Sequence, residues 1–235
     1  MKLIQPNCRV QFTAEDIQFI VDTLARHNGP SLVQLLTEAD TRDAVLDHEL
    51  LFRALLEHRQ CLRVSSHFYF YVLVRHVLRR TGVDDRNVAD YLAEVLSEYS
   101  HVDRSRCLLP GRSEPLEYFF EMVAALQTAD DRTGFSLRAH IGNYSLFFSG
   151  VFPGRIRQRV ESRGFPGLKY YEALGRSNFR AASDHRLARH YELSSIFTTL
   201  SESFEPARRA LNDLADRIFC LGDPDYGPFL SQRLS

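Results

Sequence analysis

The class of fold follows from residues 85–99, which read DRNVADYLAEVLSEY. Six apolar residues of this stretch recur at offsets of 0, 3, 4, 7, 8 and 11, the spacing that places side chains on one face of an α-helix. They are Val88, Tyr91, Leu92, Val95, Leu96 and Tyr99. Asp84 or Asp85 precedes them, and aspartate is a residue type that caps helix starts. The stretch therefore predicts an amphipathic helix that ends near Tyr99.

Similar spacing predicts helices on both sides of this stretch. Thr13 and Asp16 resemble a capping box, and Ser65 or Ser66 precedes a segment that is apolar on all sides. The further helices expected cover residues 13–28, 32–37, 41–58, 67–80, 137–149, 155–163 and 183–200, and others begin near Pro115, Leu168 and Ser203. The last of them is expected to end at Gly222.

The chain shows no pattern typical of a β-sheet. No pair of alternating apolar runs is joined by a two-residue turn. We therefore predict an all-α fold of roughly ten helices in orthogonal or bundle-like packing, formed as a single domain over residues 1–235. Residues 101–113, which contain Pro110-Gly111, interrupt the periodicity and are expected to form a long internal connection.

Composition restricts the class of protein further. The 235 residues are 44% hydrophobic and 25% charged, which suits a globular domain with a sizeable core. The net charge of −1 provides no general attraction to nucleic acid or to an anionic membrane. The four cysteines are widely spaced, without a Cys-x-x-Cys pair, and are expected to be reduced and mostly buried. Because residues 1–9 lack a signal-peptide pattern and no long apolar stretch occurs, we expect a cytoplasmic protein without a membrane span.

Common enzyme fingerprints are absent from the sequence. It contains no phosphate-binding Gly-x-x-x-x-Gly-Lys-Ser/Thr loop, no Gly-x-Gly-x-x-Gly turn, no Gly-x-Ser-x-Gly elbow and no His-Glu-x-x-His pair. One Glu-x-x-His motif occurs, at Glu98 and His101. Together with Glu94 it lies off the apolar face of its helix and is expected to face solvent. We therefore predict no metal site and no cofactor.

Three ionisable residues stand in the apolar segment 67–80, namely His67, Arg75 and His76. Such groups need a partner, because burying them unpaired costs several kcal/mol. We expect the histidines to be core residues bonded to a backbone carbonyl or a tyrosine hydroxyl, in preference to a catalytic role. Residues 75–80 are expected to emerge into solvent.

Positive charge gathers in residues 155–189. This segment has nine basic and three acidic residues, a net charge of +6, with Tyr170, Tyr171 and Phe179 interleaved. Arginine forks and aromatic rings together are typical of surfaces that bind phosphates or stack on bases. Residues 11–60, in contrast, carry a net charge of −5. The two regions are expected to attract each other, either within one chain or between copies in a homo-oligomer.

Two groups of residues are candidates for a ligand site. Arg186, Arg189 and His190 share one face of a single predicted helix, where they could hold a carboxylate or phosphate, or extend into water as ordinary surface side chains. An interior glycine of another helix, Gly142, permits close approach of either a helix or a ligand. We expect any pocket to lie between these two helices. The predicted ligand-binding residues are Arg138, His140, Asn143, Tyr144, Arg186, Arg189 and His190.

The leading hypothesis is a helical binding protein that engages an anionic small molecule or an acidic partner surface through its basic, tyrosine-containing C-terminal half. Nucleic acid is a weaker candidate partner, for which affinity should fall steeply with salt. The alternative is a helical enzyme, metal-dependent or acid/base, that uses His140, His190 and nearby carboxylates. Such an enzyme needs at least two of these groups within bonding reach in a concave site.

Overall fold

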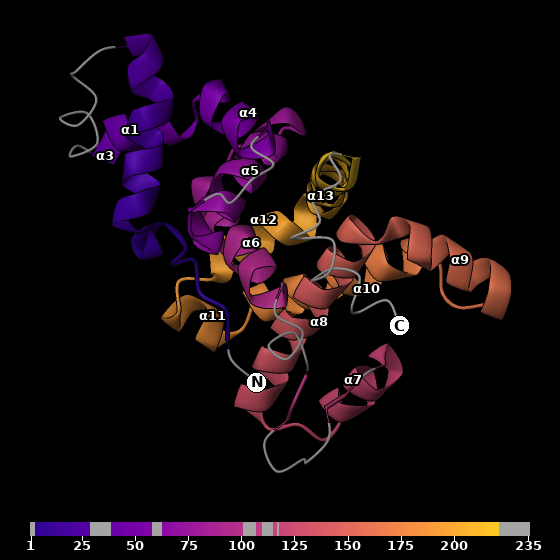
Figure 1. The fold of residues 1–235 in the computed structure, drawn as a ribbon. Coiled ribbons are helices and arrows are strands. Elements are labelled where there is room, and N and C mark those ends of the chain that lie inside the picture. Colours follow the sequence, from indigo (N-terminus) through magenta and orange to yellow (C-terminus); the bar gives the residue numbers. More distant parts are fainter. Residues whose placement is uncertain are drawn as a thin grey trace.

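The computed structural model describes residues 3–28, 39–57, 63–100, 107–109, 115–116 and 118–220. Within these ranges the chain forms α-helices and one short 3-10 helix, without a strand (Figure 1). The elements are η1 (Arg9–Gln11), α1 (Ala14–Asn28), α3 (Ala39–Leu46), α4 (Glu49–Glu57), α5 (Ser66–Arg80), α6 (Arg86–Tyr99), α7 (Phe119–Leu126), α8 (Asp131–Val151), α9 (Pro153–Arg163), α10 (Leu168–Ser183), α11 (Arg186–His190), α12 (Ser194–Glu202) and α13 (Phe204–Cys220). The predicted all-α multi-helix fold is confirmed.

The predicted caps of three helices are confirmed by their hydrogen bonds. The Asp85 side chain accepts from the first backbone N–H groups of α6, and the Ser65 hydroxyl accepts from Phe68 N at 3.1 Å at the start of α5. At the start of α1, Thr13 N donates to Asp16 Oδ2 at 2.7 Å, and Asp16 N donates to Thr13 Oγ1 at 3.3 Å. These bonds satisfy donors that a helix start leaves without intrahelical partners.

Two helices that the periodicity predicts as continuous are broken in the structure. The expected helix over 41–58 divides into α3 and α4, where His48 Nδ1 accepts from Leu50 N at 3.2 Å. The expected helix over 183–200 divides into α11 and α12, and Ser183 is the last residue of α10 instead of a cap. His185 Nδ1 caps the start of α11 by accepting from Leu187 N at 3.1 Å. The break between α11 and α12 lies between Tyr191 and Leu193, where Glu192 takes a positive φ of 57°. Both predictions were wrong because the apolar spacing continues across each break.

The helix predicted to begin near Pro115 begins four residues later. Instead of being helical, Leu116 donates its N–H to Cys107 O at 2.8 Å and forms an isolated antiparallel bridge. α7 then starts at Phe119, and the side chain of Glu121 accepts from Tyr118 N at 3.0 Å. The expected helix over 32–37, the stop at Gly222 and most of the connection over 101–113 lie outside the described residues.

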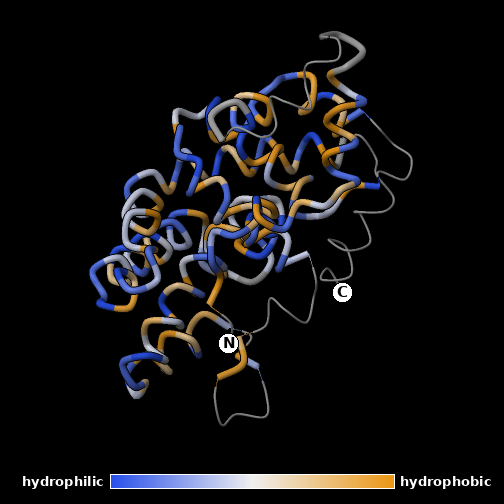
Figure 2. The backbone as a smooth tube through the Cα atoms, turned by 90° about the vertical axis from the view of Figure 1, so that its left-hand side faces the viewer, coloured by the Kyte–Doolittle hydropathy of each residue, from blue (hydrophilic) through white to orange (hydrophobic). Residues whose placement is uncertain are grey.

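Six helices, α5, α6, α8, α10, α12 and α13, form the centre of the molecule (Figure 1). α8 packs along α10, α10 packs against α12, α5 packs against α6, and α13 contacts both α8 and α5. The larger cluster of buried apolar residues extends from Ile4 to Ala215 and therefore draws on both halves of the chain. The colours of Figure 2 alternate between hydrophilic and hydrophobic along the helices. None of the described helices has the length and apolar character needed to cross a bilayer.

The polar face of α6 is buried, contrary to prediction. Glu94 and Glu98 are only 3% and 8% exposed, whereas the helical wheel placed them in solvent. The N-terminal segment and α5 cover this face, since Gln11 Nε2 donates to Glu94 Oε2 at 3.3 Å and His67 Nε2 lies 3.4 Å from the same oxygen. The amphipathic pattern identified the apolar face correctly and could not show that the opposite face has partners. His101 lies outside the described residues.

Arg75 is also buried, although the sequence placed residues 75–80 in solvent. It is 2% exposed, and it donates from Nε and Nη2 to Asp47 at 3.0 and 3.2 Å. Only Arg79 and Arg80, at the end of α5, are exposed. The prediction for His76 is confirmed, because this buried histidine has its Nδ1 3.0 Å from Val72 O.

The pairing of Asp47 predicts acid sensitivity. Burial raises the pKa of this carboxyl, but the hydrogen bonds from Arg75 and the charges of Arg75, Arg86 and Arg79 outweigh it and hold the pKa below its ordinary value. A lowered folded-state pKa contributes stability above the unfolded pKa of about 3.9, and this contribution is lost as the pH falls through the folded pKa. We expect the free energy of unfolding, from urea titrations, to fall on acidification below about pH 4.

Asp47→Asn should flatten that pH dependence, whereas Asp22→Asn, at an exposed position of α1, should leave it unchanged. An Asp47→Asn variant with the same acid sensitivity as the parent would contradict the assignment.

Candidate functional site

The predicted ligand-binding residues form two groups on two helices, α8 and α11. Arg138, His140, Asn143 and Tyr144 belong to the middle of this helix, whereas Arg186, Arg189 and His190 belong to α11. α11 is attached to the start of α8, because Arg186 Nη2 and His185 Nε2 lie 2.7 and 2.8 Å from Asp131. From Asp131 to His140 the chain advances about 2.5 helical turns. Arg189 and His190 are exposed on α11.

Asn143 connects two helices of the core. The hydroxyl of Tyr91, on α6, donates to Asn143 Oδ1 at 3.0 Å and accepts from Asn143 Nδ2 at 2.8 Å. Both side chains are buried, and burial raises the pKa of the Tyr91 hydroxyl. This pair satisfies the amide in the interior and joins α8 to α6.

Gly142 permits the close approach of another helix, which is the first of the two alternatives that the sequence left open. A Cβ atom at this position would lie 2.7 Å from ring carbons of Phe179, on α10. The relation is reciprocal, since a Cβ at Gly175 of α10 would meet Ser145 of α8 and the ring of Phe204. α8 and α10 therefore approach each other through glycines.

The two histidines of the enzyme hypothesis have different surroundings. His140 is buried, with Nδ1 3.2 Å from the Tyr99 hydroxyl, and its ring stacks on Tyr144 at a centroid distance of 6.1 Å. His190 is exposed, with its ring centroid 4.8 Å from that of Tyr191. Among the residues that the structure describes, no group of three or more histidine, cysteine, aspartate or glutamate side chains is arranged to hold a metal ion.

Three carboxylates of the acidic region form ion pairs with nearby arginines. In the described part of the chain, the carboxylates of Asp43, Asp47 and Glu49 form their ion pairs with Arg9, Arg53, Arg75, Arg79, Arg80 and Arg86. These arginines lie outside residues 155–189. The expected attraction between the acidic and basic regions is therefore not seen in these ion pairs.

Aromatic rings form a continuous array where α7, α8 and α10 meet. Tyr144 stacks on Phe148 at 5.8 Å with an interplanar angle of 9°, and Phe148 stacks on Tyr171 at 5.8 Å and 23°. Phe119 lies edge-on to both tyrosines, with centroid distances of 5.2 Å. Burial raises the pKa of the Tyr171 hydroxyl, while the charge of Arg159 opposes that rise.

Arginines of α9 cover this array. The guanidinium of Arg159 lies 5.6 Å from the centroid of Phe148, and Arg155 precedes it by one helical turn. Burial and the charge of Arg159 lower the pKa of Arg155, and the smaller influence of Tyr144 raises it. We call Arg155, Arg159, Tyr144, Phe148 and Tyr171 the arginine–aromatic cluster.

Other arginines of the basic segment are paired with carboxylates. Arg180 lies 3.8 Å from both Asp184 and Glu202, and Arg186 pairs with Asp131. The sequence predicted Tyr144 and the basic segment as binding features but not Phe148. The spacing of four residues between Tyr144 and Phe148 was the available signal, since it places both rings on one helix face.

These observations define an all-α protein of many helices, in which an arginine of α9 lies beside aromatic rings of α8 and α10. Comparison with protein families, with curated proteins and with solved structures found no match to the chain.

Proposed function

We propose that the chain is a helical binding protein that engages an acidic partner surface or an anionic ligand through the arginine–aromatic cluster. The observation that carries the proposal is the position of Arg159 over the ring of Phe148, with Arg155 one helical turn away on α9. Burial and, after it, repulsion from Arg159 lower the pKa of Arg155. A carboxylate or phosphate bound between the guanidiniums would offset that repulsion.

Exposed apolar side chains beside the cluster favour a partner larger than a simple ion. Val160, Phe165 and Tyr170 are all exposed, and the ring of Tyr170 lies edge-on to Tyr171 at 6.1 Å. Aromatic and arginine side chains together are enriched in protein interfaces. An acidic protein segment would use both the charges and the rings. The free thiols of Cys8 and Cys107 support the cytoplasm, a reducing compartment, as the proposed location.

The proposal is tested by isothermal titration of the protein with an oligoglutamate peptide at low and at high salt. The double variant Arg155→Gln/Arg159→Gln should weaken binding by about tenfold or more, because two charge-assisted contacts are lost. The parent protein should also bind less tightly at high salt. The matched control is Arg176→Gln/Arg180→Gln on α10, which removes the same charge from exposed positions and should leave the affinity nearly unchanged.

Equal losses in the two double variants would show that only net charge matters and would contradict the proposal. A single-stranded DNA oligonucleotide, titrated in parallel, separates the partners. Tighter binding of DNA than of the peptide, with the steeper salt dependence, would replace the acidic partner by nucleic acid.

A further inference from the structure

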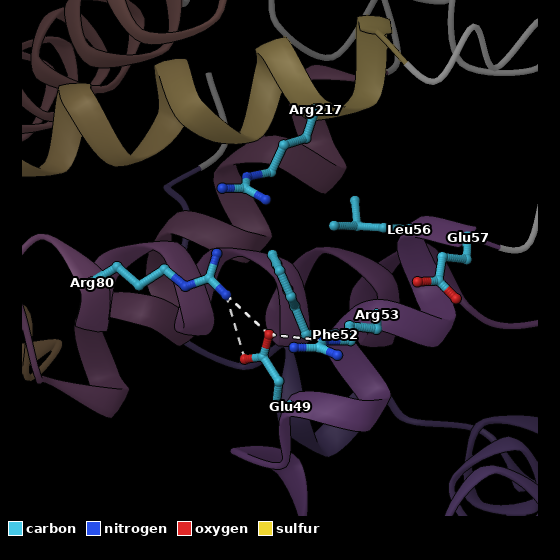
Figure 3. A pocket seen from close by; sticks show the side chains of 7 residues that line it. All are labelled: Glu49, Phe52, Arg53, Leu56, Glu57, Arg80 and Arg217. Carbon is cyan, nitrogen blue, oxygen red and sulfur yellow. Dashed lines mark hydrogen bonds and ion pairs between the residues drawn. The ribbon is translucent and has the colours of Figure 1, made fainter.

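A second set of arginines surrounds a hollow of about 590 Å³ between α4, α5 and α13 (Figure 3). The hollow is lined by Glu49, Phe52, Arg53, Leu56, Glu57, Arg80 and Arg217. None of these residues belongs to the arginine–aromatic cluster. The lining combines guanidinium groups with the apolar side chains of Phe52 and Leu56, as small-molecule sites do.

The buried ring of Phe52 fixes two of the guanidiniums. The Arg80 guanidinium lies 4.7 Å and that of Arg217 5.9 Å from the ring centroid. His76 stacks against the same ring at 4.9 Å with an interplanar angle of 14°. Arginines from α5 and α13 are thus held beside one aromatic ring, which lowers the loss of side-chain entropy when they bind a ligand.

A carboxylate already lies among these arginines. Glu49 accepts from Arg80 Nη2 at 3.1 and 3.3 Å and from Arg53 Nε at 3.4 Å (Figure 3). The pKa of Arg217 is raised, first by its hydrogen bond to Asp213 and further by the charges of Asp213 and Glu49. Glu49 therefore lies where two guanidiniums bind its carboxylate and the charge of a third, that of Arg217, adds attraction.

The arginines keep donors for a ligand. Each guanidinium has five N–H donors. In the described part of the chain, the bonds to carboxylates use Nε of Arg53, Nη2 of Arg80 and Nε of Arg217. The Glu49 side chain is 45% exposed, and exposed ion pairs contribute little to stability. A ligand can therefore displace Glu49 into water at small cost.

We propose that this hollow binds a small organic oxyanion, a carboxylate or a phosphate monoester, and that Glu49 acts as a built-in competitor for its arginines. The oxyanion is held by Arg53, Arg80 and Arg217, and the body of the ligand lies against Leu56. Glu57, on the same rim, disfavours ligands with a second negative group beside α4.

The test uses isothermal titration of the full chain with inorganic phosphate and with butyrate, a monocarboxylate, in a buffer free of other phosphates and carboxylates. Arg217→Gln should weaken binding by about tenfold, whereas Glu49→Gln should tighten it by about threefold or more, since the competing charge is gone. The probe with the higher affinity shows whether the site prefers a phosphate or a carboxylate. Either preference supports the proposal.

An exposed ion pair of the same kind on α13, Arg209 and Glu205, provides matched controls. Arg209→Gln and Glu205→Gln should leave the affinity for both probes unchanged. Failure of Glu49→Gln to tighten binding would overturn the proposal, as would parental affinity in Arg217→Gln. In the background of the double variant Arg155→Gln/Arg159→Gln, which removes binding at the arginine–aromatic cluster, Glu49→Gln should still tighten and Arg217→Gln should still weaken the binding of the probes. Loss of both effects in that background would assign the anion to the arginine–aromatic cluster instead.

Discussion

Phe197→Ala is expected to lower the free energy of unfolding by about 3–5 kcal/mol, the range for deleting a buried phenylalanine side chain. The residue is fully buried on α12. Its ring centroid lies 5.6 Å from that of Tyr91, 5.6 Å from that of Phe179 and 6.3 Å from that of Phe135. The truncation would open a cavity where α6, α8, α10 and α12 meet. Urea denaturation followed by circular dichroism measures the loss.

Two variants control this measurement. Phe197→Leu keeps most of the volume and should cost less than about 1.5 kcal/mol. Phe120→Ala removes the same side chain from α7, where it is 69% exposed, and should change the stability by no more than about 0.5 kcal/mol. Similar losses for Phe197→Ala and Phe120→Ala would contradict the packing described for the core.

Asp16→Ala is expected to lower the free energy of unfolding by about 3 kcal/mol, because three donors lose their acceptor. Asp16 is fully buried, and its Oδ2 accepts from Thr13 N and from the Ser65 hydroxyl, both at 2.7 Å. Its Oδ1 accepts from Ser65 N at 2.7 Å. One carboxylate thus serves the start of α1 and the start of α5. The same denaturation experiment measures the effect.

Asp22→Ala is the matched control, since Asp22 is exposed on the same helix and accepts from Gln18 Nε2 at 2.7 Å. Asp22→Ala should lower the free energy of unfolding by no more than about 0.5 kcal/mol. Asp16→Asn keeps one carbonyl acceptor. Its loss in free energy of unfolding should lie between the losses of the two alanine variants. A loss in Asp16→Ala no larger than in Asp22→Ala would show that the shared acceptor contributes little.

The helices with a single clear apolar face were the predictable part of the fold. α6 begins at the predicted cap and ends at Tyr99, and α13 begins one residue after Ser203. In both helices the residues of the predicted apolar face are mostly buried. For these helices the hydrophobic period is enough to locate the helix and one buried face, although the opposite face of α6 is buried as well.

What the sequence could not predict depends on contacts between distant segments. The helix break at His48 comes with an imidazole cap, and the break at Glu192 comes with a positive φ. Local spacing reveals neither of them. The burial of Arg75 depends on Asp47, which comes from another helix. A helical wheel describes one helix in isolation and treats its polar face as solvated until a partner is known.

The candidate sites, like the fold, could be predicted only in part. Tyr144 and the basic segment could be identified from composition. That both lie beside Phe148 depends on the packing of α8 against α9 and α10, which the sequence does not show. The hollow around Phe52 was not predicted at all. Its arginines come from α4, α5 and α13, and each of them looks like an ordinary surface charge in its own helix.

The glycine contacts of α8 and α10 with neighbouring helices have a consequence for evolution. Gly142 faces the ring of Phe179, and Gly175 faces the ring of Phe204, so each small residue is matched to one large residue on another helix. A relative that keeps this packing should change the members of a pair together, with an alanine in place of Gly142 accompanied by a smaller side chain in place of Phe179. These two paired positions offer a signature for recognising distant relatives after the rest of the sequence has diverged.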